Sequence, residues 1–356
     1  MMGDGAARPP REPDPVPAEK ASQPADVPKG GGLARPRWPE ARHYAALDLG
    51  TNNCRLLIAR PQGSGFAVVD AFSRIVRLGE GLASSGRLSD AAIDRTLAAL
   101  RICADKLKRR RVALARSVAT EACRRATNGA EFIARAYEET GIALDIITAE
   151  EEARLAVLGC HALLEPGDGP ALVFDIGGGS TELVLVDSSQ PVPTILDWHS
   201  APWGVVSLTE AVGHGEGADG RAASYAEMRA RVAEAFAPFV ARLDPPPGTR
   251  RLLGTSGTVT TLASVHLGLE SYDRSVVDGL IVPSASMREV SQRLAHLSLA
   301  DRAKVPCIGG ERADLVVAGC AILETILDLW PAERLGIADR GIREGILRRL
   351  MNGKML

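Results

Sequence analysis

A chain of 356 residues, with 46% hydrophobic and 24% charged residues, is long enough for about two domains with sizeable cores. Its formal net charge of −2 excludes a general attraction to nucleic acid or an anionic membrane, so an anionic ligand requires a local site. The sequence has no run of about 18 uncharged apolar residues, no apolar signal-peptide core, and six scattered cysteines without a CxxC pair. These features predict a cytoplasmic protein without a transmembrane helix, a zinc site or a disulfide framework.

Residues 1–42 differ in composition from the rest of the chain. They contain nine of the 22 prolines, several glycines and mixed charges, and few large apolar side chains. Such a segment cannot bury enough apolar surface to offset the entropy lost on ordering. It is predicted to be a disordered tail.

From residue 43, strand patterns alternate with helix patterns. The apolar runs at 44–49 and 55–60 predict a β-hairpin, and residues 66–75 predict a further strand. Alternating helices and strands are predicted next, at 89–109, 112–119, 130–139, 144–147 and 149–164.

The same plan restarts after a turn signal at 167–170. The segments DLGTNNCRLLI and DIGGGSTELVL both run from Asp-aliphatic-Gly through a small polar turn into an apolar strand. This internal duplication predicts an α/β fold with two similar domains, at 43–165 and 166–340. The elements predicted in the second half are 171–175, 182–186, 222–243, 251–254, 258–266, 287–297, 314–330, 334–337 and 341–350.

The two matched turns have the composition of phosphate-binding loops, because glycine and small polar residues let backbone N–H groups converge on an anion. Asp48 and Asp175 end the strands before the turns, where their carboxylates would face a phosphate-bound Mg²⁺. β-Hairpins also use such turns for geometry alone, but a matched pair, each preceded by aspartate, favours phosphate binding. The candidate ligands are Gly50, Thr51, Asn52, Asn53, Gly177, Gly178, Gly179, Ser180 and Thr181.

A third loop of small residues precedes the helix predicted at 258–266. Helix N-termini carry unpaired N–H groups and the positive end of the helix dipole, so this loop is another candidate anion site. An ordinary N-cap by Ser256 or Thr258 explains the same residues. The candidate ligands here are Thr255, Ser256, Gly257 and Thr258.

Three consecutive glutamates begin the helix predicted at 149–164. Thr148 and Glu151 fit a capping box, and Glu150 suits the first turn because of the helix dipole. Glu152 has no such structural role and is a candidate general base that deprotonates an attacking water. A solvated glutamate is the alternative interpretation.

Basic residues occur in two places near these elements. Arg124 or Arg125, after the strand at 112–119, could reach a phosphate, because the planar guanidinium offers a fork of donors. The cluster at 106–111 is interpreted as a solvated helix end, with a substrate-binding track as the alternative.

With these residues identified, the chain resembles the exopolyphosphatase/guanosine pentaphosphate phosphohydrolase (Ppx/GppA) family of the actin-like ATPase superfamily. The similarity covers about residues 43–350. It is carried by AALDLGTNNCRLLIA, SVATEACRRATN, IITAEEEARLAVLG, LVFDIGGGSTELVLV, LLGTSGTVTTLA, ERADLVVAG and DRGIREGIL.

The resemblance implies two ribonuclease H-like domains with an active cleft between them. It places the catalytic glutamate at Glu152, a magnesium-associated aspartate at Asp175, the phosphate loop at 177–180 and a catalytic arginine at Arg124. Thr51-Asn52-Asn53 replaces the Ser-Asn-Ser that family members often have. The resemblance also implies that the helix at 341–356 packs on the first domain. A chain that ends at residue 356 corresponds to a short form without the family's additional helical domains.

The implied activity is that of an exopolyphosphatase, which hydrolyses the terminal phosphoanhydride of inorganic polyphosphate with Mg²⁺ or another divalent ion. Guanosine pentaphosphate (pppGpp) 5′-phosphohydrolysis is the alternative substrate choice. A kinase of the same superfamily and a non-catalytic alarmone sensor are alternatives of other classes. A requirement for a monovalent cation and a homodimeric state are compatible with the resemblance. Nucleic acid and membranes are not expected partners.

Overall fold

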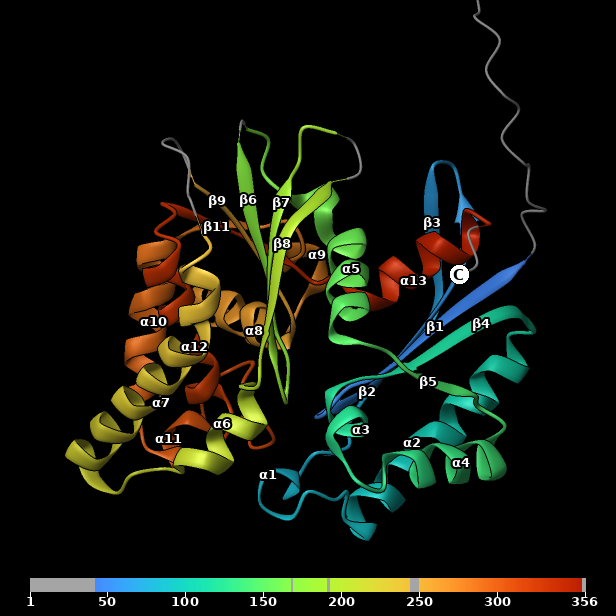
Figure 1. The fold of residues 1–356 in the computed structure, drawn as a ribbon, viewed down its shortest axis with the longest axis horizontal. Helices are drawn as coiled ribbons and strands as arrows, with labels where there is room; N and C mark the ends of the chain where they lie inside the picture. Colours follow the sequence, from blue (N-terminus) through green and yellow to red (C-terminus); the bar gives the residue numbers. More distant parts are fainter. Residues whose placement is uncertain (1–41, 168, 191–192, 244–249, 354–356) are drawn as a thin grey trace, which may run out of the picture. The chain divides into compact units, whose positions relative to one another are not determined.

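The computed structural model describes residues 42–167, 169–190, 193–243 and 250–353, so the predicted tail lies outside it apart from residue 42. The described chain forms two mixed β-sheets, each covered by helices (Figure 1). Among the helices of these ranges, none combines the length and apolar character needed to cross a membrane.

The first sheet has five strands in the order β3-β2-β1-β4-β5. β2 runs antiparallel to β1 and β3, whereas β1, β4 and β5 are parallel. Alternating apolar residues of these strands point to both faces, and both faces are buried by helices. The strands are β1 (His43–Leu49), β2 (Asn53–Gln62), β3 (Gly65–Ile75), β4 (Val112–Ala119) and β5 (Leu144–Ile146).

Two long helices cover one face of this sheet. α2 (Asp90–Arg109) and α4 (Gly129–Thr140) bury apolar side chains such as Leu97 and Phe132 against the strands. Ser89 begins α2 as its N-cap, accepting a hydrogen bond from the amide of Ala92, as predicted for a helix start. The short helices α1 (Leu82–Ser85) and α3 (Glu121–Arg125) complete this part of the chain.

The second sheet repeats the topology of the first. Its order is β10-β11-β9-β6-β7-β8, and the segment β8-β7-β6-β9-β11 has the same directions as β3-β2-β1-β4-β5. β10 is an added antiparallel edge strand. The predicted α/β fold with two ribonuclease H-like sheets is confirmed. The strands are β6 (Pro170–Ile176), β7 (Thr181–Asp187), β8 (Thr194–Ala201), β9 (Arg251–Thr255), β10 (Ile281–Pro283) and β11 (Arg334–Ala338).

Helices pack around the second sheet and form the largest apolar core, around Phe174, Phe236 and Trp330. α12 is mostly apolar and buried from Val316 to Leu327, and Asp328 near its end is exposed. β8 and α6 were not predicted, because polar residues such as Asp197 and His199 obscure the strand pattern of β8. The helices are α6 (Val205–Val212), α7 (Gly217–Val240), α8 (Gly257–His266), α9 (Arg274–Val277), α10 (Ser284–His296), α11 (Leu299–Arg302) and α12 (Val316–Leu329).

Two helices cover the other face of the first sheet. α5 (Ala149–Cys160) follows β5 and is succeeded by a 3₁₀ turn, His161–Leu163. α13 (Ile342–Met351) follows β11 of the second sheet, yet its apolar residues pack with those of β1 and α5. α5 and α13 lie side by side (Figure 1). The chain thus passes back from the second sheet to the first at the N-terminus of α13.

The basic cluster at the end of α2 has a structural partner. Lys106 Nζ and Arg110 Nε lie 2.7 and 2.9 Å from the carboxylate oxygens of Asp70 on β3. These contacts support the helix-end interpretation of the cluster. The hydrogen bond from Lys106, together with that from Arg110, lowers the pKa of Asp70 to about 2.

Asp70→Asn is expected to lower the free energy of unfolding by about 1 kcal/mol at pH 7, because Arg110 is half-exposed and solvent screens the pair. A carboxyl with a depressed folded-state pKa stabilises above its unfolded pKa, and this contribution is lost as pH falls toward the folded value. The difference between variant and wild type should therefore shrink below about pH 4. Urea unfolding between pH 7 and 3 measures this difference. The control is Asp105→Asn, which removes an exposed carboxylate of α2 that has no ion-pair partner in the described ranges. A pH-independent difference would contradict the ion-pair explanation.

Candidate active site

The two predicted turns have the same backbone geometry. The amide of Gly50 donates to the carbonyl of Asn53 at 2.9 Å, and the amide of Gly177 donates to the carbonyl of Ser180 at 2.9 Å. Each bond closes a hairpin turn, the first between β1 and β2 and the second between β6 and β7. The duplication seen in the sequence therefore extends to the hydrogen bonds of the turns.

The turns of the two sheets approach each other closely. A Cβ on Gly178 would lie 3.0 Å from the backbone nitrogen of Asn52, and one on Gly179 would lie 2.7 Å from Thr51 Oγ1. Glycine is needed at both positions because the other turn occupies the space of a side chain. In the described chain, no acceptor binds the amides of Thr51, Asn52, Gly178 and Gly179.

The third loop lies between β9 and α8. Ser256, with a φ of 110°, is the N-cap of α8, and its hydroxyl accepts a hydrogen bond from the amide of Thr258. The hydroxyl of Thr255 donates to the carbonyl of Arg340 at 2.7 Å. The capping interpretation therefore holds, and the loop also lines the pocket described next.

The three loops surround one pocket of about 140 Å³ between the two sheets. Two predicted residues are not part of its wall. The hydroxyl of Thr181 is directed away and donates to the carbonyl of Trp203 at 2.7 Å, and Arg124 lies behind Glu152. The predicted residues that line the pocket are Asp48, Gly50, Thr51, Asn52, Asn53, Glu152, Asp175, Gly177, Gly178, Gly179, Ser180, Thr255, Ser256, Gly257 and Thr258.

The three glutamates at the start of α5 have different environments. Thr148 caps the helix by accepting from the amide of Glu151 at 3.1 Å. The carboxylate of Glu151 pairs with Arg116 instead of completing a capping box, and that of Glu150 pairs with Arg154. Glu152 is 8% exposed and lines the pocket, so the solvated alternative is wrong for it.

Arg124 holds the carboxylate of Glu152 in place. Its Nη1 donates to Glu152 at 3.0 Å and to the carbonyl of Ile147 at 2.8 Å. Its Nε and Nη2 both donate to Glu121. Four of the five N–H donors of a guanidinium are therefore engaged. In this arrangement Arg124 positions Glu152 more directly than it could bind a phosphate.

Several buried carboxylates lie close together in the lining of the pocket. Burial, followed by the nearby Asp48, raises the pKa of Asp175 to about 6. Burial and the charge of Asp175 raise the pKa of Glu182 to about 7. Burial and Glu182 raise the pKa of Glu152 well above its usual value, against the effect of Arg124. Such a group of anions out of water favours a cation or a proton among them.

Glu182 is absent from the residues predicted from the sequence, although the hairpin pattern contained a signal for it. Asp175 pairs directly with Glu182 across β6 and β7, and Asp48 pairs with Arg55 at the equivalent position of β1 and β2. Side chains of directly opposed residues lie on the same face of a sheet. Each aspartate therefore has a charged neighbour seven positions later in the sequence.

The carboxylates fit a divalent cation. Oδ1 of Asp48 is buried without a hydrogen-bond partner, and burial raises the pKa of this side chain. Within the described ranges, no three His, Cys, Asp or Glu residues are arranged to enclose a metal. Mg²⁺ commonly takes one or two carboxylates and completes its shell with water and phosphate oxygens, and this is the mode that Asp48 and Asp175 fit.

Arginines not predicted from the sequence also line the pocket. Arg55 and Arg343 have no hydrogen-bond or ion-pair partner in the part of the chain that the structure describes. Burial and the charge of Arg55 lower the pKa of Arg343. A Cβ on Gly257 would lie 3.0 Å from Arg55 Nη2, so this guanidinium reaches from the first sheet to the third loop. Guanidinium groups in the same pocket as the backbone amides of the two turns are suited to binding an anion.

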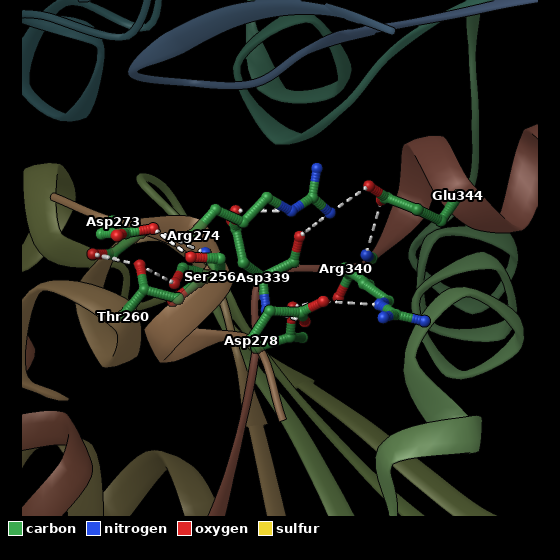
Figure 2. Close-up of polar contacts among 12 residues, drawn as sticks. Ser256, Thr260, Asp273, Arg274, Asp278, Asp339, Arg340 and Glu344 are labelled. Atoms are coloured by element: carbon green, nitrogen blue, oxygen red, sulfur yellow. Dashed lines mark hydrogen bonds and ion pairs between the residues drawn. The ribbon is translucent and has the colours of Figure 1, made fainter. Parts of the chain in front are cut away.

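A polar network supports the loop that leads from β11 into α13. Figure 2 shows Arg274 between Asp339 and Glu344, with Arg340 paired to Asp278. Arg274 Nη2 donates to the buried carboxylate of Glu344 at 3.0 Å, and Glu344 accepts from the amide of Gly341 at 2.9 Å. The network fixes the N-terminal turn of α13, which carries Arg343, at the edge of the pocket.

Comparisons with known proteins agree with this geometry. Residues 57–353 match the model of the Ppx/GppA phosphatase family. Exopolyphosphatase 2 of Mycobacterium tuberculosis is 34% identical over 316 residues, covering 85% of this chain and 96% of that protein. A guanosine-5′-triphosphate,3′-diphosphate pyrophosphatase of Aeromonas salmonicida is 31% identical over 309 residues, covering 86% of this chain and 59% of that protein.

A solved structure leads to the same assignment. The crystal structure of the Aquifex aeolicus Ppx/GppA family member superimposes with a TM-score of 0.72 at 27% identity, covering 88% of this chain and 99% of that one. The resemblance noted in the sequence is confirmed by these matches. The chain belongs to the Ppx/GppA phosphatase family.

Proposed function

We propose that the protein is an exopolyphosphatase that hydrolyses the terminal phosphoanhydride of inorganic polyphosphate and releases orthophosphate. The proposal rests on one observation above all. A single pocket is lined by backbone amides of two matched turns, by the guanidinium groups of Arg55 and Arg343, and by the buried carboxylate of Glu152. Neither these amides nor these guanidinium groups have a hydrogen-bond partner among the described residues. A hydrolase of phosphoanhydrides needs these three elements together.

The loops and arginines supply phosphate binding in this mechanism. The amides of the 50–53 and 177–180 turns and the N-terminus of α8 would donate to phosphate oxygens. Arg55 and Arg343 would neutralise charge that develops on the leaving chain. Asp48 and Asp175 would hold Mg²⁺, which when bound neutralises charge on the phosphate oxygens.

Glu152 supplies the base. Its raised pKa makes it a stronger proton acceptor than an exposed glutamate, while Arg124 favours the ionised form and fixes its orientation. The water oxygen forms a bond to the terminal phosphorus, the bridging P–O bond breaks, and the water proton passes to Glu152 Oε. The electrons of the broken bond remain on the shortened chain.

The same pocket can serve a nucleotide with a terminal phosphoanhydride. The Aeromonas salmonicida relative carries such an activity in its name, and it is matched at a level of identity close to that of the M. tuberculosis exopolyphosphatase. Guanosine pentaphosphate hydrolysis is therefore the second candidate, with the same residues in the same roles. A kinase would need an acceptor site in addition, and a sensor would not need Glu152 oriented toward the phosphate loops.

Phosphate release tests the proposal. We expect purified protein with Mg²⁺ to release orthophosphate from long-chain polyphosphate, and chelation by EDTA to abolish the release. The parallel reaction with guanosine pentaphosphate, analysed for the tetraphosphate product, ranks the two substrates. Transfer to an added acceptor without release to water would favour a kinase, and tight tetraphosphate binding without turnover would favour a sensor.

A further inference from the structure

A second groove adjoins the active-site pocket. We call it the β3 groove, because Ser73 and Arg74 of β3 form one wall and Gly309 and Gly310, in the loop before α12, form the other. Its volume is about 410 Å³. Asn53 and Arg312 line both the groove and the pocket, so the two spaces meet at these residues.

The size of the pocket requires such a continuation for a long ligand. A volume of about 140 Å³ is below the roughly 300–1,000 Å³ that encloses a drug-sized molecule. A polyanion longer than a few phosphates must therefore extend out of the pocket. The charges that line the adjoining grooves determine which groove the rest of the polyanion occupies.

The lining of the β3 groove carries a net positive charge, because Arg74 and Arg312 outnumber its one acidic residue, Glu311. Arg74 is exposed, lies 5.4 Å from the centre of the Phe72 ring, and has no ion-pair or hydrogen-bond partner in the described ranges. Arg312 provides a second cation, oriented by its hydrogen bond to Thr261. The backbone amides of Gly309 and Gly310 also have no hydrogen-bond acceptor among the described residues.

Two other spaces adjoin the pocket and are less suitable. One shares Thr51, Glu121 and Gly179 with the pocket and has a volume of only about 10 Å³. The other meets the pocket at Glu121, whose carboxylate pairs with Arg124 and Arg125. No arginine or lysine is among the described residues that line it, and the ring of His199 contacts the carbonyl of Ala235. A negatively charged chain gains no cation on that side.

The wall of the β3 groove is preformed. Arg77, just after β3, donates to the carbonyl of Glu311 at 3.1 Å and pairs with Asp314 at 3.0 Å. These contacts hold the loop before α12 against the end of β3. A ligand in the groove would not have to order this loop, so little binding energy is lost.

We infer that the β3 groove binds the phosphate groups that lie distal to the scissile anhydride of the substrate. The inference rests on the proposed function, which places the scissile phosphate in the pocket. In a polyphosphate these groups are further units of the chain. In guanosine pentaphosphate the candidate group is the 3′-diphosphate, which lies beyond the remaining 5′ phosphates. Arg74 and Arg312 provide the charges, and Gly309 and Gly310 provide backbone donors.

The test compares substrates of different length in charge variants of the groove. Arg74→Glu is expected to raise KM for long-chain polyphosphate about tenfold, the value of one charge-assisted hydrogen bond, with little change for tripolyphosphate. Gly310→Asp should act in the same way, because a side chain there meets no atom within 4 Å. Gly310→Asn is its neutral control.

Arg60→Glu controls for the change in net charge. Arg60 is exposed on the same hairpin, six residues along β2 from the partner of Arg74, or roughly 20 Å away. The Arg60→Glu variant should have the wild-type KM for every substrate. Added salt should raise the KM for long chains more steeply in the wild type than in Arg74→Glu. Salt screens the contact between Arg74 and a phosphate in the wild type, and the variant has already lost that contact.

Each outcome is decisive. A KM increase confined to long polyphosphate supports the groove as a chain site, and one confined to the pentaphosphate supports it as a 3′-diphosphate site. Equal effects on long and short substrates, or effects no larger than those of Arg60→Glu, overturn the inference. If wild-type protein releases phosphate from neither substrate, the proposed function fails. Equilibrium binding of long-chain polyphosphate to the same variants then decides the groove separately.

Discussion

Glu152→Gln is expected to reduce the turnover number by roughly two to four orders of magnitude, with KM near the wild-type value. The amide keeps the shape of the side chain but cannot accept the proton of the attacking water. The loops and arginines that would bind the substrate remain unchanged. Steady-state phosphate release from polyphosphate, fitted for the turnover number and KM separately, measures the effect.

The neighbouring glutamates provide matched controls. Glu150→Gln and Glu151→Gln make the same change on the same helix turn, but these carboxylates pair with Arg154 and Arg116. Both variants should keep near wild-type turnover. Glu152→Gln should also remain folded, because the amide has the shape of the carboxylate and its oxygen can still accept the hydrogen bond from Arg124. Near wild-type turnover in a folded Glu152→Gln protein would exclude Glu152 as the base.

Gly159→Ala is expected to lower the free energy of unfolding by about 3 kcal/mol. Helix propensity alone predicts the opposite sign, because alanine is favoured over glycine in a helix by about 1 kcal/mol. A Cβ at Gly159 would, however, lie 1.9 Å from the carbonyl oxygen of Gly341. That atom belongs to the backbone at the start of α13, so only a shift of one helix can relieve the contact.

The same shift should reduce turnover, because α5 carries Glu152 and α13 carries Arg343. Urea denaturation and phosphate release measured on one preparation test both effects. Gly65→Ala is the control, since its Cβ would meet nothing closer than 4.0 Å and its φ is not positive. A stabilised Gly159→Ala protein would show that propensity outweighs the contact and that the two helices are not closely packed in solution.

Local features of the sequence were sufficient to predict much of the fold and part of the site. The paired Asp-aliphatic-Gly turns predicted two equivalent hairpins, since strand periodicity and turn chemistry act between neighbouring residues. Thr148 caps α5 as predicted, but the predicted capping box is incomplete, because the Glu151 carboxylate pairs with Arg116. Each of these predictions depended on residues within one or two turns of chain.

The tertiary structure decided which distant groups meet. Arg55, Glu182 and Arg343 enter the pocket through strand register and through the packing of α13 on α5. Packing likewise engaged Arg124 with Glu121 and Glu152.

Local sequence patterns were therefore enough to predict the duplicated β-hairpins, their turns of small residues and a glutamate at the start of α5 without a capping role, because each follows from chemistry between neighbouring residues. The charge of the pocket and of the groove beside it followed from the packing of distant segments. That charge is a sum over side chains that are far apart in sequence, and a single-residue change in register would move them to the opposite face of a sheet.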